Sequence, residues 1–166
     1  MRLTNYTDYT LRMLIYLALK TEGRATIAEI STHYGIAETH LAKVAHELGS
    51  TGDIETIRGK GGGLRLARRP DAIRVGEIVR RTEPDMAIVP CFAGEASCAI
   101  EPECILQKAM QKALQAFLAE LDSYTLADLV APRRKLSALL DIEPLDRGRA
   151  PKANRRTRMR PQRVIV

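Results

Sequence analysis

The residues best suited to chemistry are three cysteines, Cys91, Cys98 and Cys104, the only cysteines in this sequence of 166 residues. Six and then five residues separate them, whereas structural zinc sites use a closer pair of cysteines and four ligands. An iron–sulfur cluster is larger than a single ion and takes thiolate ligands. The spacing therefore favours a cluster with one iron left without a thiolate, 4Fe–4S before 2Fe–2S. Three reactive or buried thiols are the alternative.

The cellular compartment follows from what the sequence lacks. There is no charged leader followed by an apolar stretch, and the longest apolar run is far too short to span a bilayer. An odd number of cysteines argues against a framework of disulfides. We therefore expect a cytoplasmic protein that does not associate with a membrane, with one compact domain and appendages.

The elements before the cysteines predict a helix-turn-helix. Thr7 and Asp8 precede an apolar run, which indicates a first helix capped at its start. Thr26 and Glu29 have the capping-box spacing of a second helix that ends at Gly35. The stretch AETHLAKVAHEL then has the spacing of a third helix with one buried face. Two short helices joined by a turn that contains glycine are typical of the helix-turn-helix.

A β-hairpin follows, and together with the helices it predicts a DNA-binding wing. Two β-type runs, 54–58 and 64–67, flank a turn that contains three consecutive glycines. Basic side chains at such a turn can enter a minor groove or contact phosphates. Side chains on the outer face of the third helix can read base edges. The candidate DNA-binding residues are Glu38, Thr39, His40, Lys43, Arg58 and Lys60.

The net charge of +6 does not by itself locate a DNA-binding surface. Residues 131–166 hold eleven Lys or Arg and three Asp or Glu, so the excess of positive charge belongs to the end of the chain. From Asp141 onward the sequence has no apolar periodicity, which is typical of a disordered tail. The basic turn of the hairpin is the better indication of nucleic acid binding.

A long amphipathic helix is predicted from Glu103 to Asp122. Its apolar stripe is broad enough to pair with a helix of a second subunit, or to pack against its own domain. The fold class is therefore mainly α with a small β-hairpin, a winged helix-turn-helix with a long dimerisation helix. The expected parts are a DNA-binding domain (1–83), a cysteine loop (84–102), the dimerisation and terminal helices (103–140) and a basic tail (141–166).

Four stretches in this order resemble one family of bacterial transcription regulators. They are MRLTNYTDYTLRMLIYLAL, the hairpin IRGKGGGLRL, the three cysteines, and LAELDSYTLADLV. Over about residues 1–130 the sequence is similar to the Rrf2 family, and within it to the repressors that sense nitric oxide. The resemblance implies a homodimer that binds an operator in double-stranded DNA, holds an iron–sulfur cluster and responds to nitric oxide.

The same resemblance gives Asp8 a role as the ligand that completes the cluster of the partner subunit. From the residues alone, Asp8 is instead a carboxylate that favours the dipole of the first helix and pairs with Arg12. A regulator that responds to iron or to redox state shares the other features and is the alternative function. An electron-transfer iron–sulfur protein is a more distant alternative. No acid–base pair or nucleophile arrangement indicates an enzyme.

Overall fold

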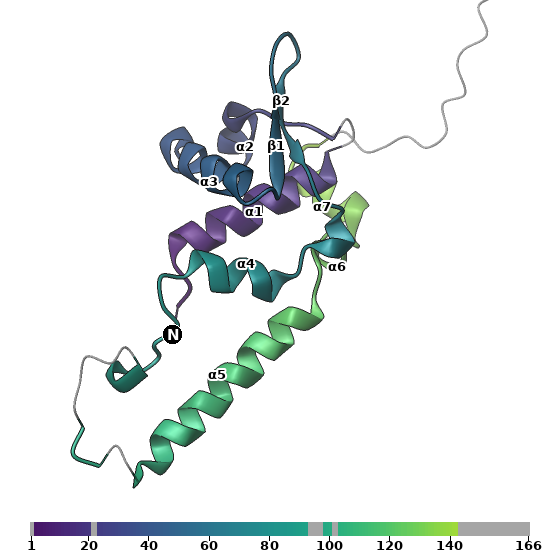
Figure 1. The fold of residues 1–166 in the computed structure, drawn as a ribbon. Coiled ribbons are helices and arrows are strands. Elements are labelled where there is room, and N and C mark those ends of the chain that lie inside the picture. The colour runs from purple at the N-terminus through teal and green to yellow at the C-terminus, as the bar shows by residue number, and fades with distance from the viewer. Residues whose placement is uncertain (1, 21–22, 93–97, 101–102, 143–166) are drawn as a thin grey trace, which may run out of the picture.

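The structure is a computed structural model that describes residues 2–20, 23–92, 98–100 and 103–142. Residues 143–166 of the predicted basic tail lie outside the described residues, whereas Ile142, also placed in the tail, is buried in the core. The prediction of a mainly helical fold with a small hairpin is confirmed (Figure 1). Within these ranges the elements are α1 (Asn5–Leu19), α2 (Ile27–Tyr34), α3 (Glu38–Ser50), β1 (Ile54–Ile57), β2 (Gly63–Leu66), η1 (Pro70–Ala72), α4 (Val75–Thr82), η2 (Pro90–Phe92), α5 (Ile105–Ser123), α6 (Leu126–Leu129) and α7 (Arg133–Leu139).

Helix α1 forms the centre of the fold. Its core side chains, among them Met13, Leu14 and Tyr16, are fully buried, and α3, α4, α6, α7 and β2 pack against it. The prediction that Thr7 and Asp8 precede this helix is wrong, because the helix begins earlier. Thr4 is the N-cap, and its hydroxyl accepts from the backbone N–H of Thr7. Asp8 therefore lies in the first turn of α1.

The helix-turn-helix is formed by α2 and α3. The Thr26 side chain caps α2 as predicted, by accepting from the N–H of Glu29. Gly35 ends α2 with a φ of 63°, in the left-handed region that glycine adopts without steric cost. Leu41 and Val44 turn the apolar face of α3 into the core, so its opposite face is left for solvent.

Strands β1 and β2 form an antiparallel hairpin in which Ile54 lies opposite Leu66 and Ile57 lies opposite Gly63. The strands end slightly earlier than the predicted runs at 58 and 67. Gly59 and Gly61 have positive φ in the turn between them. Figure 1 shows this hairpin beside α3, the arrangement of a wing next to a recognition helix.

The apolar spacing of Ile73, Ile78 and Val79 predicts a helix from Ala72 to Glu83, whereas α4 begins at Val75. Backbone pairing over a long distance in sequence explains the later start. The N–H of Leu126 donates to Ile73 O at 2.8 Å, and the N–H of Val75 donates to Tyr124 O at 3.0 Å. These bonds hold residue 73 in an extended conformation and fasten the end of α5 to the start of α4.

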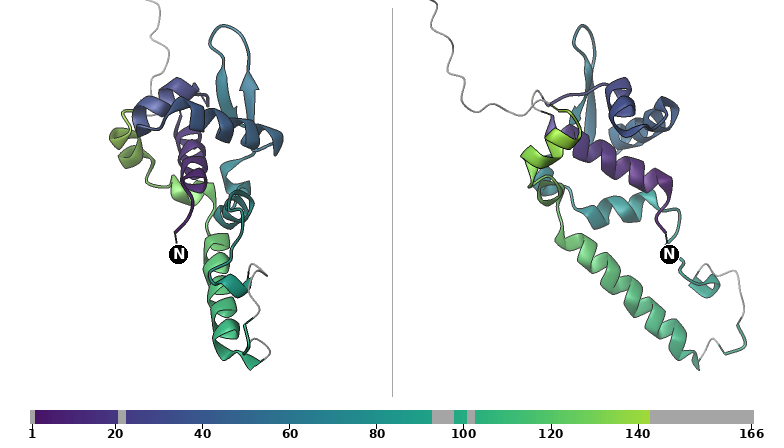
Figure 2. Two further views of the ribbon diagram at one scale, coloured as in Figure 1. Left: turned by 90° about the vertical axis from the view of Figure 1, so that its left-hand side faces the viewer. Right: turned by 180° about the vertical axis from the view of Figure 1, so that it is seen from behind.

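Helix α5 extends away from the body that α1 to α4 form, as the two views of Figure 2 show. The structure describes all of its residues, and none of them is buried. Of its apolar side chains, Ile105 is 80% exposed and Leu106 is 66% exposed. Both predicted alternatives stay open, because α5 packs against α4 of its own domain while Ile105 and Leu106 remain exposed.

Candidate DNA-binding face and cysteine segment

The first two turns of α3 present the predicted recognition side chains to solvent. Glu38, Thr39, His40 and Lys43 are all exposed. No side chain caps this end of α3, where Ala37 occupies the N-cap position. The ring of His40 lies 5.9 Å from the ring of Tyr9, measured between centroids. The start of α3 is therefore an open surface, with a contact back to the first turns of α1.

Ion pairs occupy most of the basic side chains in and after the hairpin and leave two of them without an acidic partner in the described structure. Arg65, Arg68 and Arg69 each pair with an acidic side chain. Arg58 and Lys60 are exposed and take part in no ion pair that the structure describes. The positive charge that remains for a DNA phosphate or a minor groove thus lies at the turn of the wing.

A buried carboxylate at the base of the wing was not singled out from the sequence. The Asp53 side chain has no exposed area, and it accepts from Arg68 at 2.9 Å, from the Thr51 hydroxyl at 2.7 Å and from Arg81. Arg68 follows β2 and Arg81 belongs to α4. Asp53 therefore ties the base of the wing to α4. The single signal in the sequence is an acidic residue next to an apolar strand.

Asp8 lies on the surface of α1 and forms an ion pair with Arg12, with the carboxylate and guanidinium 2.9 Å apart. Their side chains are 45% and 43% exposed, respectively. The guanidinium carbon also lies 5.7 Å from the centroid of the Tyr34 ring, at the last residue of α2. The predicted pairing within α1 is thus confirmed, and the Asp8 carboxylate faces solvent on one side.

The three predicted cysteine ligands lie on separate parts of the described chain. Cys91 is half-buried in η2, Cys98 is exposed, and Cys104 is the N-cap of α5. The Cys104 sulfur accepts from the backbone N–H of Gln107 at 3.4 Å. Within the described residues, which leave out 93–97 and 101–102, no three His, Cys, Asp or Glu side chains are gathered to hold a metal ion. The structure does not bring the three thiols together.

The chemistry of this donor set nevertheless suits an iron–sulfur cluster. All three thiols are free of disulfide bonds. Cys104 stands at the N-terminus of α5, a helix of 19 residues. Thiolates are the ligands that iron–sulfur clusters take. Cys91, Cys98 and Cys104 are therefore the residues that would hold such a group.

The C-terminal end of α5, which is its base against α4, is held by charged side chains. Arg80 of α4 forms an ion pair with Asp122, and Arg74 donates to the Asp122 backbone oxygen at 2.7 Å. The hydrogen bond from Arg80 lowers the pKa of the Asp122 carboxyl. A Cβ at Gly76 would lie 2.2 Å from an oxygen of the Asp122 carboxylate, so only glycine permits this approach. The base of α5 is thus firmly placed against α4.

Comparison with known families identifies this arrangement. The family model described as "Rrf2: Iron-dependent Transcriptional regulator" matches residues 3–132, most of the chain. The chain belongs to the Rrf2 family. Its curated relatives include the HTH-type transcriptional regulator NsrR of Geobacillus kaustophilus, which is 49% identical over 142 residues, 84% of this chain and 97% of the relative. The NsrR of Bacillus subtilis is 48% identical over 145 residues, 86% of this chain and 99% of the relative.

Solved structures agree with the Rrf2 fold. The global cysteine regulator CymR of B. subtilis matches with a TM-score of 0.65 and 27% identity, covering 80% of this chain and 98% of that one. The IscR of T. potens matches with a TM-score of 0.66 and 25% identity, covering 82% and 90%. This Rrf2 chain is therefore a member of a family of transcription regulators and not of an enzyme family. None of its described helices is long and apolar enough to cross a membrane.

Proposed function

We propose that this protein is a homodimeric transcriptional repressor whose binding to operator DNA depends on an iron–sulfur cluster and is relieved by nitric oxide. One observation carries the proposal. The segment that bears all three cysteines, 84–104, directly joins α4 of the DNA-binding part to α5, a helix with no fully buried side chain. A group that binds the three thiols therefore acts on the connection between the two parts.

DNA binding is supported by the exposed start of α3 and the free cations of the wing. Glu38 can accept from a cytosine amino group, Thr39 can contact a base edge or a thymine methyl, and Lys43 can reach a guanine or a phosphate. His40 lies beside them. Arg58 and Lys60 extend the same surface to the neighbouring phosphates or minor groove. A repressor of this kind occupies the operator with one such surface from each subunit.

Dimerisation is supported by α5. A helix of 19 residues with Ile105 and Leu106 exposed leaves apolar area in water unless a second helix covers it. A second copy of α5 supplies the same apolar stripe, as expected for a two-fold symmetric interface. Two α3 helices must lie about one turn of DNA apart, roughly 34 Å, to bind successive major grooves. Any change in how the subunits are held alters that spacing.

Cys91, Cys98 and Cys104 would hold the cluster, and Asp8 of the partner subunit would be the fourth ligand. When bound, the cluster supplies iron that reacts with nitric oxide. A carboxylate is a hard ligand among soft thiolates, so Asp8 gives the weakest of the four bonds. Asp8 pairs with Arg12, whose guanidinium lies against the Tyr34 ring of α2, and the neighbouring Tyr9 lies beside His40 of α3. A group held by Asp8 would therefore be coupled to the DNA-binding helices.

The experiment is anaerobic purification followed by iron and sulfide analysis, an absorbance spectrum and an operator-binding assay with and without nitric oxide. We expect a loaded, coloured protein that binds the operator tightly and releases it when nitric oxide is added. Colourless protein without iron or sulfide, prepared anaerobically, would show that the three cysteines serve another purpose.

An iron-responsive or redox-responsive regulator is the second candidate, and the description of the family model as iron-dependent favours it. The same assay separates the two functions. Release of the operator when iron is limited, by a protein whose loaded form keeps the operator in the presence of nitric oxide, indicates an iron signal. Oxidation without either treatment releases it if the signal is redox state. A response to nitric oxide at concentrations that leave iron and redox state unchanged supports the first candidate.

A further inference from the structure

The end of α4 and its C-cap contact three other parts of the fold through four consecutive residues. Arg80 pairs with Asp122 at the end of α5, and Arg81 pairs with Asp53 at the base of the wing. Thr82 and Glu83 both reach the first turn of α1. The cysteine segment starts at the next residue. This junction is therefore where the cysteine segment, the wing, α5 and the turn that carries Asp8 meet.

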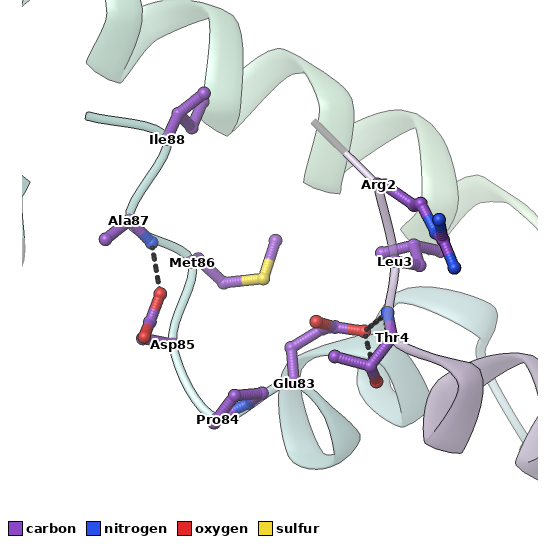
Figure 3. A pocket seen from close by; sticks show the side chains of 9 residues that line it. All are labelled: Arg2, Leu3, Thr4, Glu83, Pro84, Asp85, Met86, Ala87 and Ile88. Carbon is purple, nitrogen blue, oxygen red and sulfur yellow. Dashed lines mark hydrogen bonds between the residues drawn. The ribbon is translucent and has the colours of Figure 1, made fainter. Parts of the chain in front are cut away.

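Glu83 provides the contact to α1. One oxygen of its carboxylate accepts from the Thr4 backbone N–H at 2.8 Å and from the Thr4 hydroxyl at 3.1 Å (Figure 3). The same oxygen accepts from the Thr7 hydroxyl. The Thr7 hydroxyl also lies 2.9 Å from that of Thr82. Thr7 has no exposed area and Thr82 is 7% exposed, so water does not replace these bonds readily. A carboxylate at the N-terminus of α1 is also favoured by the helix dipole.

The same carboxylate stands at the start of the cysteine segment. Residues 83–88 line one side of a pocket of about 290 Å³, and Arg2, Leu3 and Thr4 line the other side. The pocket therefore separates these two segments along most of this stretch. Figure 3 shows the Glu83 carboxylate reaching across to Thr4 at the base of this pocket. Asp85, two residues on, accepts from the N–H of Ala87 in its own loop. Glu83 is thus the link between the two sides.

We propose that Glu83 is a positioning residue for the cluster site, an inference that rests on the proposed function. Its carboxylate fixes the start of the cysteine segment to the turn of α1 that carries Asp8, whose backbone N–H donates to Thr4 O at 3.1 Å. In the proposed dimer, Asp8 serves the cluster of the partner, whereas the cysteines serve their own. Each Glu83 therefore contributes to both cluster sites, and its loss loosens both.

The test is the rate of iron release from anaerobically loaded full-length dimer to an excess of chelator. Glu83→Ala should release iron about tenfold faster than the wild type, which corresponds to about 1.4 kcal/mol, because it removes the acceptor that the Thr4 N–H and the Thr4 and Thr7 hydroxyls share. Glu83→Gln keeps an acceptor oxygen at the same place and should stay within about twofold of the wild type. Asp85→Ala is the matched control, because it removes a carboxylate from the same segment, and should not change the rate.

Thr7→Val removes the donor without changing the size of the side chain, and it serves as the second variant if Glu83→Ala folds poorly. It should also speed iron release. The double variant with Glu83→Ala should release iron little faster than either single variant, because both changes remove the same bond between Thr7 and Glu83. A role confined to stability would lower the melting temperature of the apo protein and leave iron release well below that temperature unchanged. That result in loaded variants overturns the role of Glu83, whereas a wild type that binds no cluster overturns the proposed function itself.

Discussion

Replacing Asp8 by Ala should change the stability of the fold very little. The cap of α1 is Thr4, so the loss of a capping bond does not apply. The ion pair with Arg12 joins side chains that are nearly half exposed, and such pairs contribute about 0.3–0.5 kcal/mol. A carboxylate in the first turn of a helix contributes about 0.3–1 kcal/mol through the helix dipole. We therefore expect a loss of about 1 kcal/mol, which lowers the melting temperature by about 2–4 °C.

The effect on the proposed cluster should be much larger. Without the carboxylate of the partner subunit, one iron has an open or water-filled position. Iron should therefore be released faster, and DNA binding should depend less on the cluster. Asp8→Cys supplies a fourth thiolate and should hold iron longer than Asp8→Ala. The assays are thermal unfolding of the apo protein, iron release to a chelator, and operator affinity measured with loaded and apo protein.

Arg12→Ala is the matched control for Asp8→Ala. It removes the same ion pair from the other end and leaves the carboxylate in place. If Asp8 acts as a ligand, the two variants have similar stability and Asp8→Ala alone loses iron quickly. If Asp8→Ala retains iron and binds the operator as Arg12→Ala does, Asp8 has a role within α1 only, and its assignment as a ligand is wrong.

Three further predictions concern the remaining parts of the site. Replacing any one of the three cysteines by Ala should abolish cluster binding, and unchanged iron and sulfide content would remove that residue from the site. Arg58→Ala should weaken operator binding and reduce the slope of log affinity against log salt by about one, and an unchanged slope would contradict the role of the wing. Asp53→Ala should lower the free energy of unfolding by about 2–3 kcal/mol because it removes the fully buried acceptor that Thr51, Arg68 and Arg81 share. The exposed pair of Asp71 should contribute under about 1 kcal/mol to the same measurement, and equal losses for Asp71→Ala and Asp53→Ala would refute the importance of burial.

Local patterns predicted those parts of the fold that local interactions determine. The cap at Thr26 and the end of α2 at Gly35 depend on residues a few positions apart, and both are as the sequence indicated. The start of α4 was predicted too early because the backbone at residue 73 pairs with the chain near residue 125, which no periodicity reveals. The cap of α1 was misplaced because Thr7 lies closer than Thr4 to the apolar run that begins at Leu11, although the Thr7 hydroxyl faces Thr82 of α4.

The exposed residues of the candidate site could be predicted from the sequence, whereas the acidic residues that hold its elements together could not. Outward-facing positions of α3 and the turn of the wing follow from the apolar spacing of the same elements, so Lys43 and Arg58 could be chosen from sequence. Asp53 and Glu83 could not, because their partners lie up to 79 residues away, and an isolated acidic residue gives no signal of burial. The gathering of the three cysteines stays a prediction, since the described residues do not show it.

The most direct test of the central claim is the operator affinity of one anaerobic preparation, measured by titration before and after nitric oxide is added at constant salt. The cluster is followed by absorbance in the same samples. The account predicts tight binding by the loaded protein and a loss of affinity that follows the loss of cluster absorbance. Operator affinity that stays constant while the cluster absorbance disappears would contradict it, because the cysteine segment would then have no influence on the DNA-binding face.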